Sequence, residues 1–173
     1  MSAHYSNYSN TDGKSAFLSG AVSALADAYL CKALPKYWAL ETDVFEAGTS
    51  DLCGCIRKRL KDYLSDPDAD IADKTDGLDF SLQLLSEEPE QIIHDLFDRY
   101  KAGHVPDESD LIKSFLSDVR YQLGEPKGIY RVEGALTEEI TDVLSGFYTY
   151  VIFEILFIEY NGFIVMLVFG SDE

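Results

Sequence analysis

The segment that most constrains the fold is YVIFEILFIEYNGFIVMLVFG, residues 150–170, near the end of the sequence. Asn161-Gly162 divides it into two apolar runs, and Asn-Gly between such runs is the strongest short-range signal for a β-hairpin. The segment is also about as long as the roughly 20 residues that span a bilayer. However, Glu154 and Glu159 lie inside it, and a charge at the bilayer centre costs about 2.5–3.5 kcal/mol. We therefore expect a hairpin in a protein that does not enter a membrane.

A two-residue turn at Asn161-Gly162 fixes the register of this hairpin. Glu159 is then expected to pair with Ile164, and Phe157 with Met166. Both faces of the hairpin are nearly all apolar, and an apolar face must pack against another element. We therefore expect helices to cover one face and a different element to shield the other.

Apolar residues at helical spacing, together with capping residues and helix-ending glycines, predict helices before the hairpin. The predicted helices span 15–34, 36–48, 51–64, 89–103, 108–123 and 138–147. LDFSLQLL, residues 78–85, fits a helix or a strand, and we favour the helix. IYRVEG, residues 129–134, is a candidate third strand.

The length of 173 residues is that of one domain, and 46% hydrophobic residues suffice for a packed core. The sequence predicts an α+β fold, mostly helical, with a C-terminal antiparallel β-hairpin that extends to three strands if IYRVEG joins it. The domain is expected over residues 15–173, with helices over about 15–147 and the hairpin over about 148–169. Residues 1–14 are rich in Ser, Asn and Tyr, and we expect a flexible lead-in without a secretory signal.

The sequence contains no recognisable catalytic or metal-binding pattern. Cys31, Cys53 and Cys55 are expected to be reduced and mostly buried, because a structural zinc site needs four ligands in spaced pairs. A nucleophile elbow, a phosphate loop, a zinc helix and a Gly-rich dinucleotide turn are all missing from the sequence. We therefore expect a non-enzymatic protein in the cytoplasm of a bacterial host cell, with no catalytic residues, no metal and no cofactor.

The formal net charge of −17 is concentrated in two blocks. Residues 62–98 hold 12 acids and one base, and residues 132–173 hold 8 acids and no lysine or arginine, whereas 1–61 and 99–131 are each at net +1. Like charges brought close together cost about 1 kcal/mol per pair even at aqueous dielectric. The blocks thus predict a solvated acidic face or a surface for a basic partner. Direct nucleic-acid binding by this face is not expected, because phosphate contacts need clustered Lys and Arg.

DPDADIADKTDG, residues 66–77, is the densest part of the first acidic block. As a calcium loop it lacks two required residues, because Ile71 stands where the turn glycine belongs and Gly77 where the bidentate glutamate belongs. A functional calcium site is therefore not expected. In an extended segment, alternate residues are about 6.6 Å apart and project to the same side. The aspartates can then form a row of negative charges spaced like successive phosphates.

Further acids continue this series into the helix that follows Pro89. We predict a partner-binding acidic surface made of Asp66, Asp68, Asp70, Asp73, Asp76, Asp79, Glu87, Glu88, Glu90, Asp95 and Asp98. The only basic cluster, RKRLK, offers a secondary contact through Arg57, Lys58, Arg59 and Lys61. An acidic surface of this kind suits the Arg- and Lys-lined channel of a DNA-binding protein, and its association would be steered electrostatically.

The small size, the missing catalytic motifs and the acidic blocks 62–98 and 132–173 resemble small anti-defence inhibitors of phages and mobile elements. These are the anti-CRISPR and anti-restriction proteins of the DNA-mimic type. The ending FEILFIEYNGFIVMLVFGSDE also looks like small proteins of mobile elements. The resemblance implies an inhibitor of a nuclease, such as a Cas9–guide RNA complex or a restriction enzyme, because such effectors hold nucleic acid in a basic channel. The near-neutral blocks depart from a whole-surface mimic, so blocked assembly or a blocked conformational change is an alternative to imitating DNA.

Two other functions fit the same sequence. An immunity protein that neutralises a basic toxin nuclease would share the acidity and the lack of catalysis. An acidic scaffold or interaction subunit would instead dock its apolar hairpin on a partner. The sequence leaves the oligomeric state open.

Overall fold

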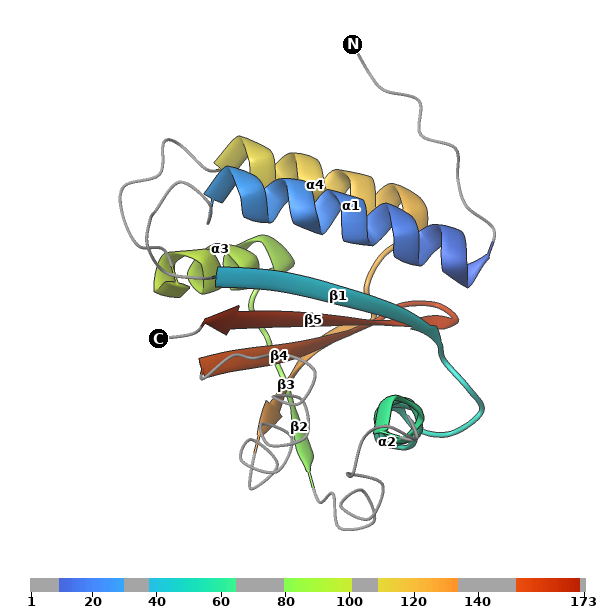
Figure 1. Cartoon of the computed structure of the whole chain (residues 1–173). Helices are drawn as coiled ribbons and strands as arrows, with labels where there is room; N and C mark the ends of the chain where they lie inside the picture. Colours follow the sequence, from blue (N-terminus) through green and yellow to red (C-terminus); the bar gives the residue numbers. More distant parts are fainter. Residues whose placement is uncertain (1–9, 30–37, 65–79, 101–108, 134–151, 172–173) are drawn as a thin grey trace.

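The computed structural model describes residues 10–29, 38–64, 80–100, 109–133 and 152–171. In this part of the chain, four helices and five strands follow one another (Figure 1). Their order is α1 (Thr11–Tyr29), β1 (Trp38–Glu46), α2 (Leu52–Leu64), β2 (Ser81–Leu84), α3 (Pro89–Tyr100), α4 (Ser109–Leu123), β3 (Gly128–Glu133), β4 (Ile152–Glu159) and β5 (Phe163–Ser171). The predicted helix over 138–147 lies outside the described residues.

The predicted hairpin forms the centre of the sheet. The strand order is β1-β5-β4-β3-β2, and every neighbouring pair is antiparallel. The predicted register is confirmed, because Phe157 lies opposite Met166 and Glu159 lies opposite Ile164. Gly162 has a φ of 85°, a conformation that costs glycine nothing and that the turn requires. The candidate third strand is confirmed as β3.

The predicted helix over 36–48 is wrong, because this segment contains β1. The strand pairs with β5 along its whole length, from Trp38 opposite Ser171 to Glu46 opposite Phe163. Val44 packs into the core on one face of the sheet and Phe45 into the core on the other, as the alternation of a strand demands. Pairing with β5 satisfies backbone groups that an open edge would expose, and this long-range gain overrides the local helical spacing.

The helix favoured over 78–85 is also wrong. Residues 81–84 form β2, and Leu82 lies opposite Val132 of β3. The α+β class is confirmed, but the strands make up a five-stranded sheet and not a C-terminal hairpin alone. The predicted helices that begin near Asp51, Pro89 and Glu108 are confirmed as α2, α3 and α4. The first predicted helix is α1, which begins at Thr11, four residues before Ser15.

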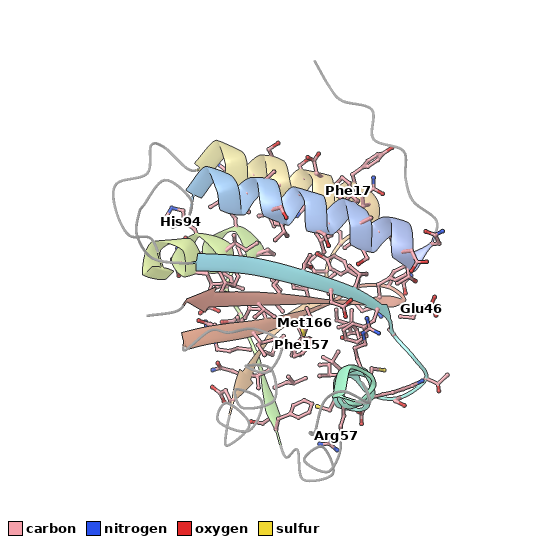
Figure 2. All side chains as sticks on the ribbon, in the orientation of Figure 1. Phe17, Glu46, Arg57, His94, Phe157 and Met166 are labelled. Carbon is pink, nitrogen blue, oxygen red and sulfur yellow. The ribbon has the colours of Figure 1, made fainter. Side chains whose placement is uncertain are left out.

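The sheet carries a hydrophobic core on each face. Helices α1, α3 and α4 cover one face, and α2 covers the other (Figure 1). The second core joins Ile56 of α2, which is fully buried, to sheet residues that include Phe157 and Met166 (Figure 2). We expected helices on one face and a different element on the other; among the described residues both faces are shielded, and the element on the second face is also a helix. Side chains 155–158 and 164–169 are all buried, so these positions offer no apolar docking surface.

Candidate functional site

The predicted acidic surface is described only in its second half. Glu87, Glu88, Glu90 and Asp95 lie at or within α3. The six candidates Asp66, Asp68, Asp70, Asp73, Asp76 and Asp79 lie outside the described residues, and so do the side chains of Asp98 and Lys61. The structure therefore locates the α3 end of the predicted surface.

Helix α3 separates its apolar and polar residues onto two faces. Ile92, Ile93 and Leu96 are buried against the sheet and α4. Glu88 and Asp95 are exposed. Residues three and four apart share one face of a helix, so Glu88, Gln91 and Asp95 form a solvent-facing row. Gln91 Nε2 donates a hydrogen bond of 2.6 Å to Asp95 Oδ1, and this bond orients the carboxylate without neutralising it.

Three glutamates gather at the N-terminus of α3. The positive end of the helix dipole favours negative side chains there, typically by about 0.3–1 kcal/mol each. Glu87 Oε2 accepts a hydrogen bond from the Ser86 backbone N at 3.0 Å. Glu90 is paired with Lys113 of α4 at 3.6 Å. Among the described residues, Glu87 and Glu88 have no basic partner, so two of the three charges remain available.

Most of the basic side chains in the described part of the chain contact the protein itself. Five of them form ion pairs with acids, namely Arg59 with Asp43, Lys113 with Glu90, Arg120 with Glu125, Lys127 with Glu159 and Arg131 with Glu154. The buried Lys14 donates to the Gln122 carbonyl oxygen and lies 5.2 Å from the centre of the Phe163 ring. Positive charge is therefore largely compensated inside the molecule, whereas the carboxylates of Glu87, Glu88 and Asp95 have no basic partner among the described residues.

The basic cluster on α2 is also engaged. Arg59 forms an ion pair of 2.9 Å with Asp43 of β1. Arg57 lies over the Phe80 ring at 5.3 Å, a distance typical of a cation–π contact. Lys58 is exposed. The predicted secondary basic contact is thus reduced, within the described residues, mainly to Lys58.

A groove of about 300 Å³ lies between α3 and α4, and no pattern in the sequence indicates it. We call it the α3–α4 groove. Its apolar wall is formed by Pro89, Ile93, Leu116, Val119, Ile129 and Ile158, its floor by Tyr160, and its polar rim by Glu88, Glu90, Lys113 and Arg120. A shallower depression continues past Glu88 and Arg120 towards Glu87, Glu125 and Lys127. The groove joins the acidic end of α3 to the end of α4.

Tyr160 lies at the end of β4, at the floor of the groove, and is 4% exposed. Burial raises the pKa of its hydroxyl, while the nearby charge of Arg120 lowers it and that of Glu125 raises it. The hydroxyl is therefore neutral at physiological pH, and the charges of Arg120 and Glu125 both act on it. No described residue forms a hydrogen bond with this hydroxyl. Among the described residues the only buried side-chain oxygen or nitrogen without a partner is Thr42 Oγ1, so the Tyr160 hydroxyl reaches the solvent of the groove and is open to a hydrogen bond from an occupant.

Within the described residues, no group of three His, Cys, Asp or Glu side chains is placed to hold a metal ion. The helices described here include none that is both long and apolar enough to cross a bilayer. Comparison of the chain with family models, with curated proteins and with solved structures found no match.

Proposed function

We propose that this protein is a non-enzymatic inhibitor that binds the basic nucleic-acid-binding surface of a nuclease through its acidic residues. The proposed target is an effector of a bacterial defence system, in the first place a Cas9–guide RNA complex, which makes the protein an anti-CRISPR inhibitor. Its place of action is then the cytoplasm of the bacterial host. The proposal follows from the resemblance of the sequence to anti-defence inhibitors, and it includes the DNA-mimic mechanism that this resemblance implies.

One observation carries the proposal. The exposed carboxylates Glu87, Glu88 and Asp95 have no basic partner among the described residues, whereas most described lysines and arginines contact their own protein. Intramolecular pairing would have neutralised these acids at little cost, as it does for Glu90. An acidic row left unpaired on a rigid helix suits a cationic surface of a partner, because helix residues one turn apart are about 5–6 Å from each other.

Electrostatics also sets how such an inhibitor would act. A preformed acidic surface attracts a basic channel at long range and speeds association by roughly 10–10³-fold at low ionic strength. Exposed charges more than about 8–10 Å apart are screened at physiological salt. Inhibition by this route is therefore expected to weaken as salt rises. An immunity protein for a basic toxin nuclease would use the same surface, and the choice of target in the assay separates the two.

The test is DNA cleavage by a purified Cas9–guide complex, with and without the protein, at 50 mM and at 300 mM salt, both chosen to bracket physiological screening at about 150 mM. We expect loss of cleavage that high salt relieves. Full cleavage at both salts would reject the Cas9-type target, and the same assay with a basic toxin nuclease would then test the immunity function.

A pair of matched variants tests the surface itself. Glu88→Gln with Asp95→Asn removes two charges from α3, and Asp118→Asn with Glu133→Gln removes two charges elsewhere. We expect the α3 variant to inhibit about tenfold less, as the loss of steering charges predicts, and the second variant to inhibit like the wild type. Equal inhibition by both would mean that only total charge matters and would count against this surface.

A further inference from the structure

The charges around the α3–α4 groove do not cancel. The groove and its shallower continuation are lined by four acids, Glu87, Glu88, Glu90 and Glu125, and by three bases, Lys113, Arg120 and Lys127. Each base is paired, Lys113 with Glu90, Arg120 with Glu125 and Lys127 with Glu159. Glu87 and Glu88 are left without a basic partner in the described part of the chain. A cation entering the groove would therefore find two uncompensated carboxylates at its rim.

The floor of the groove supplies a second, independent feature. The Tyr160 side chain is almost completely buried, and its hydroxyl has no hydrogen-bond partner among the described residues. A neutral phenol can accept a hydrogen bond as well as donate one. The acceptor capacity of this hydroxyl suits the N–H groups of a guanidinium.

The size and wall chemistry of the groove restrict the occupant further. A volume of about 300 Å³ is at the lower limit of ligand pockets. The walls are mainly aliphatic, from Pro89, Ile93, Leu116 and Ile129. They suit a single long side chain with an apolar stem and a charged end. Arginine combines such a stem with a flat end that forms paired hydrogen bonds to carboxylates, which the compact ammonium of lysine does not.

We propose that the α3–α4 groove receives one arginine side chain of the basic partner, with its guanidinium between Glu88 and the Tyr160 hydroxyl. The inference rests on the proposed function for the source of this arginine. It adds a specific anchor to a surface that would otherwise act by charge alone. Anchors of this kind, an arginine in a desolvated pocket, carry much of the binding energy of protein interfaces.

The direct test needs no nuclease. The 15N-labelled full-length protein is titrated with N-acetyl-arginine amide and, in parallel, with the citrulline analogue, which has the same shape but no charge. We expect chemical-shift changes confined to α3, α4 and the end of β4, at least about tenfold weaker with citrulline, because a charge-assisted hydrogen bond is lost. Equal shifts with both compounds, shifts spread over all acidic residues, or binding of benzoate at the same site would each overturn the proposal.

Variants then connect the groove to inhibition. Tyr160→Phe keeps the ring and removes only the hydroxyl, and Glu88→Gln removes only the charge, while Glu133→Gln is the control outside the groove. Each variant is first checked for an unchanged melting temperature. We expect both groove variants, but not the control, to bind the arginine probe about tenfold more weakly. If the wild type inhibits the nuclease but binds no probe, the groove proposal fails alone; if the probe binds as expected and no nuclease is inhibited, the proposed function fails alone.

Discussion

Arg59 of α2 binds Asp43 of β1 through two hydrogen bonds, from Nε to Oδ2 at 2.9 Å and from Nη2 to Oδ1 at 3.1 Å. The pair joins the only helix on its side of the described sheet to the edge strand β1. Arg59 also lies 5.8 Å from the centre of the Phe45 ring. A residue of the basic cluster therefore serves to attach α2 to the sheet.

The two-bond geometry predicts how α2 responds to substitution. Arg59→Lys keeps the charge but loses the planar guanidinium that forms two hydrogen bonds. We expect the free energy of unfolding to fall by about 1 kcal/mol, a small loss because the ion pair is partly exposed to solvent. Lys58→Ala changes an exposed neighbour and is expected to stay within about 0.5 kcal/mol. Urea unfolding followed by circular dichroism checks both. A loss as large for Lys58→Ala would mean that the charge of the helix matters and the geometry does not.

Two glycines predict opposite effects of the same substitution. At Gly128, an added Cβ would lie 2.8 Å from the Tyr130 hydroxyl oxygen, whereas at Gly20 it would meet nothing within 4 Å. We expect Gly128→Ala to cost about 1–3 kcal/mol, because the ring must move. We expect Gly20→Ala to stabilise α1 by about 0.5–1 kcal/mol, because it reduces the entropy of the unfolded chain. Melting curves of the two variants give the sign of each change, and a stabilised Gly128→Ala would contradict the close contact.

The features that local sequence predicted well are those with a local physical cause. Asn161-Gly162 set the register of β4 and β5, and Pro89 marked the start of α3. The failures have a long-range cause. The apolar residues in the segment that contains β1 have a spacing that fits a helix. The segment is nevertheless a strand, because it pairs with β5, which is more than 100 residues away in the sequence. No local pattern reports such a pairing.

Some properties of the candidate site likewise follow from the local sequence, and others do not. The positions of the acids could be predicted from sequence, since charge is a property of each residue. Their pairings could not, because Lys127 and Glu159 are 32 residues apart, and Arg131 and Glu154 are 23 apart. The groove depends on packing between α3, α4 and the sheet. Its shape and the burial of Tyr160 therefore could not be predicted from any short segment of the sequence. Only the fold brings these residues together.

The burial of Lys14 leads us to expect that the free energy of unfolding depends on pH with a definite sign. Burial lowers the pKa of its ammonium below the usual 10.5, so between the lowered pKa and 10.5 the unfolded chain binds more protons than the folded one. Stability contributed through this group therefore rises as pH increases through that window. We expect the difference in unfolding free energy between wild type and Lys14→Met to shift in favour of the wild type from pH 8 to pH 10. Using the difference removes the shared effect of Tyr130, whose pKa burial and Glu159 raise. A constant difference would contradict the desolvation of Lys14.

At Thr42 we expect that a substitution can be made without lowering the stability of the protein. Its hydroxyl oxygen on β1 is buried and has no hydrogen-bond partner among the described residues. Thr42→Val keeps the branched shape that a strand favours and removes the unsatisfied group. We expect the variant to be as stable as the wild type or up to about 1 kcal/mol more stable. A loss of more than about 1 kcal/mol on urea unfolding would mean that the hydroxyl does have a partner.

The aspartate-rich segment, residues 66–77, lies outside the described residues, but its role in inhibition can be tested by substitution. If Asp66, Asp68, Asp70 and Asp73 belong to the surface that meets the nuclease, changing all four to lysine reverses the local field. We expect the concentration needed for half inhibition to rise by about tenfold or more, because steering by the acidic surface is lost. The melting temperature is expected to change little, since none of these residues follows the apolar spacing of a core.

A matched pair of double variants separates position from total charge. Asp66→Lys with Asp68→Lys is compared with Asp118→Lys and Glu133→Lys, which shift the net charge by the same amount from the α4 and β3 surfaces. We expect the first pair to weaken inhibition and the second to have little effect. Unchanged inhibition by the first pair, with a normal melting curve, would remove this segment from the binding surface and leave α3 and the groove to carry the contact. Equal weakening by both pairs would instead show that the nuclease responds to net charge, and the spacing of the aspartates would lose its role.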